Sequence, residues 1–351
     1  MIYQISYGIS YGDAVGNEIL AIHRLLKKSG FRTGILAERV SRVMSFRPEI
    51  RRLDGSFRPA ESDVILYHIT CGCELNRRIF EYGCRVIVRY HNITPPHYFE
   101  GYNDDLVRSC ELGRAQLKEM AGKPALALAD SGFNKTDLTE AGFSCPIRVI
   151  PILKKPMKTF FRTPDPHRIL AVGRIAPNKR VDMVIKAFFE YRKRFDPRAR
   201  LTIAGSYKGL EKYKQELDDL CGGSSAVVFT GHITNAGLSM LFGRAGLYMT
   251  MSDHEGYCVP LVEAMEYGIP VLAASTSAIP ETLGGSGILL NDLDPETVSE
   301  AMHKALSDPD YRNSILDGQY RRAYELSYRK VGKKMLEALA GITRPVPGDS
   351  D

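Results

Sequence analysis

The sequence predicts an α/β protein built from two Rossmann-like domains. Short apolar runs alternate with helical patterns through both halves of the chain, and this alternation favours parallel sheets covered by helices. The length of 351 residues exceeds the usual size of a single hydrophobic core. A proline-rich segment with several lysines near the middle, Pro151 to Pro166, separates the two halves. We therefore expect domains at residues 1–155 and 160–325.

Each expected strand is a short apolar segment, and a glycine-bearing or polar loop follows several of them. In the first half the expected strands are Ile2–Tyr7, Thr33–Ala37, Val64–His68, Arg85–Tyr90, Ala125–Ala129 and Ile147–Ile150. In the second half they are Ile169–Val172, Arg200–Ala204, Val227–Thr230, Gly246–Met251 and Pro270–Ala273. The tail Thr343–Asp351 has the composition of a disordered segment.

Composition indicates a cytoplasmic protein. No basic N-terminal region precedes an apolar run, and no stretch approaches 18 consecutive apolar residues, so we expect neither export nor a membrane span. Seven cysteines, an odd number, lack paired metal-ligand spacing and suit a reducing compartment. The pattern Cys71-Gly72-Cys73 is more typical of a loop than of a zinc or redox site.

The net charge of +6 lies entirely in the first half, where residues 1–165 hold 24 basic and 18 acidic side chains. Six arginines between Arg39 and Arg58 alternate with apolar residues. Such a segment can contact an anionic membrane surface or a phosphorylated acceptor, or it can be a solvated loop. Nucleic acid is a less favoured partner, because no basic motif interleaved with aromatic residues occurs.

The most informative motif is a pair of glutamates, Glu255 and Glu263, on either side of an expected helix start at Pro260. Eight residues of helix rise about 12 Å. Glycosidase carboxylates lie only roughly 5–9 Å apart, so this pair fits the two ends of an elongated ligand better. Free N–H groups at the helix start, near Leu261, would suit a diphosphate between them.

A second motif supplies positive charge. An expected strand ends at Gly173, and Arg174 and Lys179 follow it toward the next helix. Arginine binds two phosphate oxygens at once and lysine supplies a compact charge, so the two could neutralise a leaving diphosphate without a metal. No Asp-x-Asp pair suitable for a divalent ion is evident, because Asp292, Asp294 and Asp308 fit turns and helix caps.

Together these motifs resemble the retaining family 4 glycosyltransferases of the GT-B fold (glycosyl transferases group 1), and the resemblance covers nearly the whole chain. It implies two Rossmann-like domains that face a central cleft, with a C-terminal helix, residues 326–342, crossing back to the first, acceptor-binding domain. It implies that the second domain binds a nucleotide sugar, with Arg174 and Lys179 on the diphosphate, Glu255 on the sugar and Glu263 on the ribose. The further donor-binding candidates in this domain are Gly173, Ile233, Gly256, Tyr257, Cys258, Val259, Leu261 and Val262. Arg180 departs from the family, because many relatives have glycine there.

The first loop, from Gly8 to Glu18, lacks the Gly-x-Gly-x-x-Gly spacing of a dinucleotide site. In the resembling family this loop closes over the donor phosphates, so Gly12, Asp13 and Gly16 are donor-binding candidates. The alternative is a glycine-rich turn that only satisfies backbone geometry.

His91 follows another expected strand and begins a polar loop stopped by proline. Relatives place a histidine here against the donor sugar, which makes His91 a catalytic candidate; the alternative is a packed histidine with no ligand. The loop that starts at Asp130 is expected to line the same cleft.

These observations predict a metal-independent, retaining hexosyltransferase that uses no cofactor besides its nucleotide sugar. Family resemblance slightly favours GDP-mannose, although no residue decides the base. A lipid-linked or cell-surface glycan precursor at the inner membrane face is the expected acceptor, by analogy alone. The alternatives are a catalytically silent sugar-binding GT-B scaffold and, less favoured, a Rossmann oxidoreductase, which would need the missing glycine fingerprint.

Overall fold

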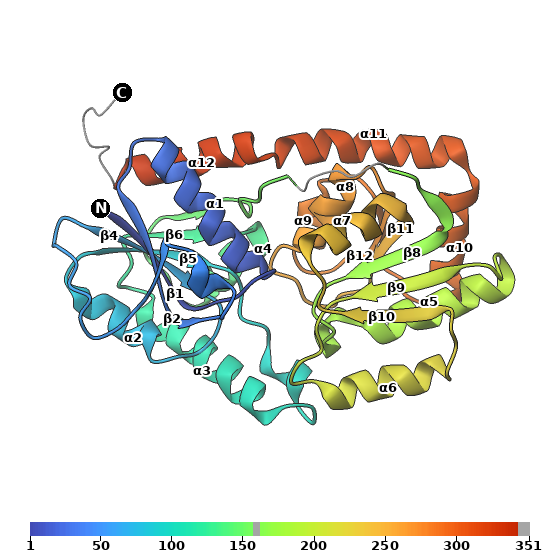
Figure 1. The fold of residues 1–351 in the computed structure, drawn as a ribbon, viewed down its shortest axis with the longest axis horizontal. Coiled ribbons are helices and arrows are strands. Elements are labelled where there is room, and N and C mark those ends of the chain that lie inside the picture. Colours follow the sequence, from blue (N-terminus) through green and yellow to red (C-terminus); the bar gives the residue numbers. More distant parts are fainter. Residues whose placement is uncertain (157–161, 343–351) are drawn as a thin grey trace. The chain divides into compact units, whose positions relative to one another are not determined.

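The computed structural model describes residues 1–156 and 162–342, and the chain divides into two compact units (Figure 1). Unit 1 comprises Met1–Pro96, Asp105–Lys155 and the C-terminal part from Ser327 onward. Unit 2 comprises His97–Asp104 and Pro156–Leu326.

Unit 1 is built on a sheet of seven strands within the described residues, in the order β3-β2-β1-β4-β5-β6-β7. All neighbouring strands are parallel. The strands are β1 (Ile2–Ile9), β2 (Thr33–Val40), β3 (Ile50–Arg52), β4 (Val64–Ile69), β5 (Arg85–Tyr90), β6 (Leu126–Ala129) and β7 (Ile147–Val149). The chain order reverses between β1 and β4, and open α/β sheets bind ligands at such a switch point, beyond the carboxyl ends of the strands.

The helices of unit 1 connect these parallel strands. They are α1 (Ala14–Lys28), α2 (Leu75–Arg78), α3 (Asp104–Met120), α4 (Gly132–Glu140) and α12 (Tyr328–Ala340), with short 3₁₀ turns η1 (Met44–Phe46) and η2 (Ile79–Tyr82). Helix α1 starts at the N-cap Asp13, whose carboxylate accepts hydrogen bonds from the N–H groups of Val15 and Gly16.

The C-terminal helix α12 belongs to the core of unit 1, as the family resemblance implies. Its residues Val331, Met335 and Leu339 are fully buried in one cluster with Ile2 and Leu66 of the sheet. The Tyr328 hydroxyl at its start also donates a 3.2 Å hydrogen bond to the Ala21 carbonyl of α1. Figure 1 shows α1 and α12 side by side. The last part of the chain therefore folds with the first.

Unit 2 repeats the architecture with a sheet of six strands in the described residues, in the order β10-β9-β8-β11-β12-β13. Its neighbouring strands are also all parallel. They are β8 (Asp165–Val172), β9 (Arg200–Ala204), β10 (Val227–Gly231), β11 (Ala245–Thr250), β12 (Val271–Ala274) and β13 (Ile288–Leu290). The switch point lies between β8 and β11, so the loops after these two strands are adjacent.

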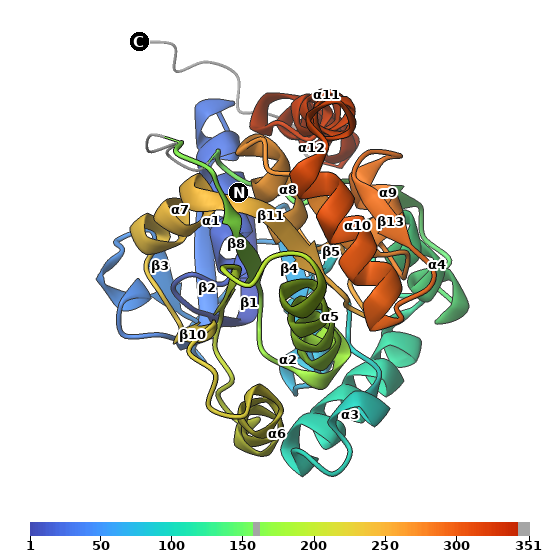
Figure 2. The same ribbon diagram turned by 90° about the vertical axis from the view of Figure 1, so that its right-hand side faces the viewer.

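The helices of unit 2 follow its strands in turn. They are α5 (Val181–Arg194), α6 (Glu211–Cys221), α7 (Asn235–Arg244), α8 (Val259–Glu266), α9 (Ile279–Leu283), α10 (Pro295–Ser307) and α11 (Pro309–Glu325), with 3₁₀ turns η3 (Pro96–Phe99) and η4 (Pro177–Lys179). Helices α5 and α10 lie side by side against the sheet (Figure 2). In the described parts of the chain, no helix combines the length and apolar character needed to cross a membrane.

Several boundaries differ from the sequence-based expectation. Strands β3 and β13 were not predicted, although β7, which also has three residues, was; β3 and β13 are fixed by pairing with β2 and β12. Strand β8 begins at Asp165, four residues earlier than expected. The predicted linker thus ends inside a strand, and its residues 157–161 lie outside the described chain, as does the predicted disordered tail.

Residues 97–104 were expected in the first domain but pack with unit 2. The Tyr102 hydroxyl donates to Glu216 at 2.9 Å, and the Asn103 amide donates to the Gly209 carbonyl at 2.7 Å. Lys212 donates in turn to the Gly101 carbonyl at 2.9 Å. This segment follows a unit 1 strand in sequence, so its association with unit 2 depends on side-chain contacts that no local pattern announces.

Candidate functional site

The loop after β8 brings backbone unusually close to a neighbouring loop. Gly173 adopts φ 153°, and its N–H donates to the Ala204 carbonyl at the end of β9. A Cβ atom at Gly205 would lie only 1.7 Å from the Gly173 carbonyl oxygen, so Gly205 can carry no side chain without moving this loop. Gly173 was predicted as a site residue, whereas Gly205 was missed because nothing in its own sequence context sets it apart.

Lys179 and Glu255, two of the predicted catalytic residues, form an ion pair. Lys179 Nζ lies 2.7 Å from Glu255 Oε2, with the side chains 23% and 11% exposed. The Ser252 hydroxyl donates to the other carboxylate oxygen at 2.9 Å, and it also lies 2.9 Å from the Thr250 hydroxyl. The carboxylate is therefore held from both sides in a largely desolvated position, where electrostatic interactions are stronger than in water.

Asn178 fixes the two loops that carry this pair. Its amide donates to the His254 carbonyl at 3.1 Å, and its own carbonyl accepts from the Asp253 N–H at 2.9 Å. Asn178 is buried, and these hydrogen bonds satisfy its polar groups in the absence of water. Asn178 was not predicted as a site residue, and the only signal in the sequence was an asparagine in the proline-started turn before Lys179.

Arg180 adopts the left-handed conformation, with φ 47° and ψ 46°. Its guanidinium donates to Asp253 and to Asp182, each at 3.2 Å. A glycine would adopt this backbone without a steric penalty, so the departure at Arg180 falls at a position whose conformation favours glycine. The ion pairs to Asp182 and Asp253 hold Arg180 in this left-handed backbone conformation, which the Cβ atom of any residue other than glycine disfavours.

Helix α8 begins at Val259, one residue before the start expected at Pro260, and Glu255 lies in the turn that precedes it, as expected. Cys258, with φ 69°, precedes the first helical residue Val259, so Glu255 lies outside the helix and the rise of about 12 Å does not apply to the full spacing of the glutamates. The Glu255 N–H donates to the Ser277 hydroxyl at 2.9 Å. Burial, followed by the charge of Glu255, raises the pKa of the Cys258 thiol, so this thiol stays protonated at neutral pH.

Two residues at the start of α8 offer no unpaired N–H to a ligand, and the predicted diphosphate contact with N–H groups near Leu261 stays a prediction. Pro260 has no N–H, and the Leu261 N–H donates to the Cys258 carbonyl at 3.1 Å. The side chains of Tyr257, Cys258, Leu261 and Val262 are buried in the core of unit 2, so they shape the turn and the helix rather than present side chains to a ligand.

The remaining unit 2 candidates are more accessible. Arg174 is exposed, and its guanidinium carbon lies 5.9 Å from the ring centroid of Phe99. Gly256, Val259, Glu263 and Ile233 are partly buried. Glu263 projects from α8 four residues after its first residue, and Ile233 precedes α7. Their predicted contacts with a donor remain predictions.

In unit 1 the first loop fits the alternative explanation based on backbone geometry. Gly12 has φ 77°, and Asp13 caps α1 at 3.3 Å from the Gly16 N–H. A Cβ atom at Gly16 would lie 2.8 Å from the Ser10 carbonyl oxygen. All three residues therefore have structural reasons for their identity, and their predicted contact with donor phosphates remains a prediction.

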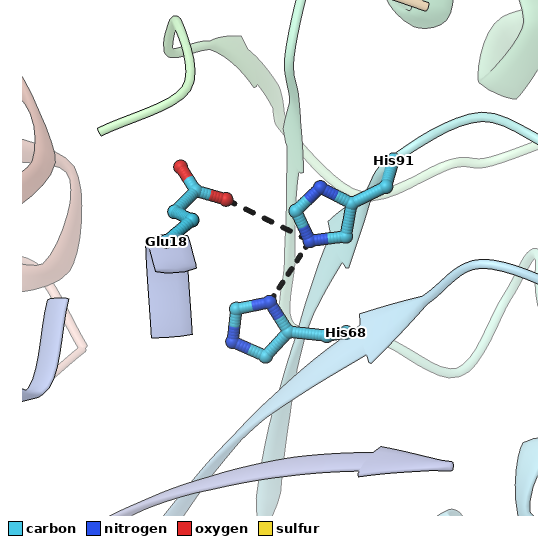
Figure 3. A group of neighbouring side chains, drawn as sticks. All are labelled: Glu18, His68 and His91. Carbon is cyan, nitrogen blue, oxygen red and sulfur yellow. Dashed lines mark hydrogen bonds and ion pairs between the residues drawn. The ribbon is translucent and has the colours of Figure 1, made fainter. Parts of the chain in front are cut away.

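His91 is buried, with a side chain only 2% exposed. Its Nε2 lies 2.9 Å from His68 Nδ1 (Figure 3). Its Nδ1 lies 3.0 Å from Asp130 Oδ2. Both ring nitrogens thus have protein partners, which fits the alternative of a packed histidine, and the predicted contact of His91 with the donor sugar stays a prediction. The carboxyl ends of β4, β5 and β6 bring these three side chains together, which the sequence alone did not reveal.

The basic segment of unit 1 borders a cavity of about 1000 Å³. Arg39, Arg52 and Arg58 contribute to its lining, and the Arg39 guanidinium lies 4.8 Å from the ring centroid of Tyr7. Acidic side chains such as Glu38 and Asp54 also line it. The arginines therefore face a concave, mixed-charge surface rather than a uniformly basic one.

The acidic residues excluded as metal ligands do cap helices. Asp294 accepts from the Glu296 N–H at the start of α10, at 3.0 Å, and Asp308 accepts from the Tyr311 N–H at the start of α11, at 2.9 Å. Asp292 accepts from the Asp294 N–H at 2.9 Å. Their carboxylates thus satisfy backbone groups at helix starts, as the sequence predicted.

Comparison with known proteins agrees with this architecture. Residues 156–322 match the family model described as Glycosyl transferases group 1. Over 192 residues the chain is 30% identical to the serotype-specific mannosyltransferase WbdA of Escherichia coli, an alignment that covers 54% of this chain and 23% of that protein. Over 203 residues it is 28% identical to the GDP-mannose-dependent alpha-(1-6)-phosphatidylinositol monomannoside mannosyltransferase of Mycolicibacterium smegmatis, covering 54% of this chain and 52% of that one. The chain thus aligns with about a quarter and about half of the length of these relatives.

Among solved structures, the crystal structure of HepE from Anabaena in complex with UDP and glucose superposes with a TM-score of 0.75 at 16% identity. The match covers 96% of this chain and 99% of HepE. Two parallel Rossmann-like sheets and a C-terminal helix that returns to the first define the GT-B class of glycosyltransferase folds. The chain shares this fold, and its residues 156–322, which belong to unit 2, match the glycosyl transferases group 1; assignment to family 4 is consistent with this match.

Proposed function

We propose that the chain is a retaining hexosyltransferase that moves a hexose, with mannose as the first candidate, from a nucleoside diphosphate sugar to a hydroxyl acceptor. The observation that carries this proposal is the Lys179–Glu255 ion pair. It joins the loops after β8 and β11, the two strands at the switch point of the unit 2 sheet. Ligands of open α/β sheets bind at this position.

The charged residues of this site are suited to stabilise a diphosphate as it leaves the sugar. Lys179 and the exposed Arg174 supply positive charge where negative charge grows as the sugar leaves. Glu255, held by Lys179 and Ser252, is fixed before the ligand arrives, and such preorganisation lets it orient the sugar and stabilise its oxocarbenium character. Glu263 on α8 is assigned to the ribose. No step of this scheme requires a metal ion or another cofactor.

Mannose is the first candidate because both relatives described above are named as mannosyltransferases, one of them GDP-mannose-dependent. A UDP-hexose is the second candidate donor, because HepE was crystallised with UDP and glucose. For the acceptor we propose a lipid-linked or cell-surface glycan precursor met at the cytoplasmic face of a membrane. The phosphatidylinositol monomannoside in the name of one relative and the arginine-lined cavity of unit 1 support this choice.

The test begins with melting temperatures of the full chain in GDP, UDP, ADP and NAD, and in GDP-mannose and UDP-glucose. A ligand that binds only the folded protein raises its melting temperature, and we expect one nucleoside diphosphate and its sugar to do so. Release of that diphosphate is then measured with a membrane lipid extract as acceptor. The anomeric configuration of the product, determined by NMR, tests retention.

Lys179→Ala supplies the decisive variant. Loss of a charge-assisted contact should weaken nucleoside diphosphate binding about tenfold or more, which corresponds to about 1.4 kcal/mol. Lys186→Ala is the matched control, because Lys186 lies one helix turn into α5 and pairs only at the surface, 3.5 Å from Asp182. Equal affinity in both variants, or a response to NAD alone, would contradict the proposed donor site.

A further inference from the structure

Unit 1 contains a fully buried group of titratable side chains, Glu18, His68 and His91 (Figure 3). Glu18 comes from α1, His68 from β4, and His91 follows β5 directly. Their side chains are at most 2% exposed. Burial of a charged or polar group is costly unless it is paired, so the arrangement of protons within this group is strongly constrained.

The hydrogen bonds around the group define the tautomer of His68. The Gln4 amide nitrogen donates to the Ile19 carbonyl at 3.0 Å, which directs its oxygen toward His68 Nε2 at 3.2 Å. An amide oxygen only accepts hydrogen bonds, so His68 Nε2 must carry a proton. In a neutral His68 ring, Nδ1 is then left with a lone pair.

His91 is constrained in the same way. Its Nδ1 faces Asp130 Oδ2 at 3.0 Å, and an ionised carboxylate only accepts. His91 Nδ1 therefore carries a proton, and Nε2 of a neutral ring would present a lone pair. Yet this nitrogen lies 2.9 Å from His68 Nδ1. The ring planes differ by only 8° and the centroids lie 5.2 Å apart, so the rings meet at their edges, as in a hydrogen bond.

Two lone pairs cannot face each other at this distance without a positive charge between them. The distance between the two nitrogens favours a single proton over a metal ion. Two nitrogens that bind one zinc ion at about 2.0–2.1 Å each lie more than about 3 Å apart in tetrahedral geometry, whereas His68 Nδ1 and His91 Nε2 are 2.9 Å apart. Glu18 and Asp130 contribute two negative charges and Arg89 one positive charge, with Arg89 Nη2 at 2.7 Å from Glu18 and 2.8 Å from Asp130, so the surroundings favour an added positive charge.

Glu18 is also poorly placed as a metal ligand. Its Oε1 accepts from Arg89 and from the Leu153 N–H at 2.8 Å, and its Oε2 accepts from Arg89 Nε at 3.2 Å. His91 Nε2 lies 3.7 Å from Oε2, a distance that suits attraction to a positive ring. Asp13, near the start of α1, adds a further negative charge that interacts with His91.

We propose that folded unit 1 binds one proton between His68 and His91, so that His91 is an imidazolium that donates from Nε2 to neutral His68. The assignment of the charge to His91 follows from its contact with Asp130 and its proximity to Glu18. Burial, with the charges of His91 and Arg89, lowers the pKa of His68 far below its ordinary value, which keeps that ring neutral. His91 thus acts as a positioning residue that joins the ends of β4, β5 and β6.

This proton couples folding to pH. In an unfolded chain both histidines lose their protons above about pH 6.5, the ordinary histidine value. The folded state then binds one more proton than the unfolded state, so stability falls as pH rises through and beyond that value until the folded pair releases its proton. The folding equilibrium constant should decrease about tenfold per pH unit in this window.

The direct test is a long-range ¹H–¹⁵N spectrum of the full chain labelled in its histidine rings, recorded at neutral and mildly alkaline pH. One buried histidine should show two protonated nitrogens, and another should show a protonated Nε2 with a bare Nδ1. Two neutral rings would overturn the proposal. So would a stoichiometric metal ion found by elemental analysis after dialysis and lost in His68→Asn.

A second measurement uses protection of β4 and β5 amides from hydrogen exchange across the same pH range. His68→Asn can donate an amide N–H to a neutral His91, so the decline in protection with pH should flatten in this variant. His232→Asn, at an exposed histidine of unit 2, should keep the wild-type slope. Equal slopes in all three proteins would overturn the proposal. The spectrum of the wild-type chain still tests it if His68→Asn does not fold.

Discussion

At the residue scale, the proposed donor site depends on how Glu255 is held. Lys179 and Ser252 occupy one carboxylate oxygen each, at 2.7 and 2.9 Å. Asn178 and Ser277 fix the backbone on either side. A carboxylate that is oriented and partly neutralised before the donor binds needs little reorganisation during transfer.

The two glutamates should therefore respond differently to substitution. Glu255→Gln should lower the saturated turnover about 100-fold, the effect typical of losing a preorganised electrostatic group, while nucleoside diphosphate affinity stays near its original value. Glu263→Gln should instead weaken affinity for the free nucleotide. Calorimetric titration and saturated transfer rates separate the two effects. Glu266→Gln, on the same helix, is the control, and full turnover in Glu255→Gln would show that Glu255 has another role.

Arg180 offers a test of backbone strain. Arg180→Ala removes the ion pairs to Asp182 and Asp253 but keeps a side chain in the left-handed region, where Cβ costs about 1 kcal/mol. Arg180→Gly removes the same ion pairs and the strain. The glycine variant should therefore be more stable than the alanine variant by about 1 kcal/mol, measured by urea unfolding. Equal stability would mean that the loop relaxes in the alanine variant.

At the scale of elements, the packing of α12 explains how the C-terminus contributes to unit 1. The helix buries Val331, Met335 and Leu339 against the sheet, and Gly332 allows it to approach α1, since a Cβ there would lie 3.2 Å from Leu25. Loss of this helix would expose an apolar face of the first sheet, so unit 1 requires residues from both ends of the chain.

Met335→Ala tests this contribution. Removing a fully buried methionine side chain should cost about 2–5 kcal/mol, because the cavity it leaves is only partly filled by relaxation. Hydrogen exchange should show reduced protection in β1 and β4 of unit 1, with β9 and β12 of unit 2 unaffected. Lys334→Ala, at an exposed position of the same helix, is the control. A loss of protection that is equal in both units would indicate that they unfold together.

At the scale of the whole molecule, two sheets of the same class are assembled from one chain, and each has a switch point next to its first strand. The proposed donor site lies in unit 2, the unit that contains the whole matched family segment. The buried Glu18, Arg89, His68 and His91 group belongs to unit 1.

Transfer should not depend on a divalent ion if Arg174 and Lys179 neutralise the diphosphate. Turnover of the donor should persist after extensive dialysis and in excess EDTA, within about twofold of the untreated rate. Calcium-saturated EDTA controls for effects of the chelator itself. Complete loss of turnover that magnesium or manganese restores would show that carboxylates at the site serve a metal ion.

The sequence by itself determined the fold class and the positions of most strands. β5 and β9 match the expected Arg85–Tyr90 and Arg200–Ala204, because short apolar segments bounded by polar loops encode strands locally. It also placed Lys179 and Glu255 in loops after strands, which parallel topology then brings to one edge of a sheet. Asp292 and Asp294 were recognised as capping residues for the same local reason.

Only the tertiary structure decided how side chains far apart in sequence meet. The pairing of Lys179 with Glu255, the buried bonds of Asn178 and the close approach at Gly205 each depend on a neighbouring loop. Strands β3 and β13 exist only because longer strands offer them hydrogen-bonding partners. His91 shows the distinction most clearly. Its sequence position predicted a ligand contact, but the carboxyl ends of three strands converge on its ring and satisfy both nitrogens, and long-range packing of this kind leaves no local signal in the sequence.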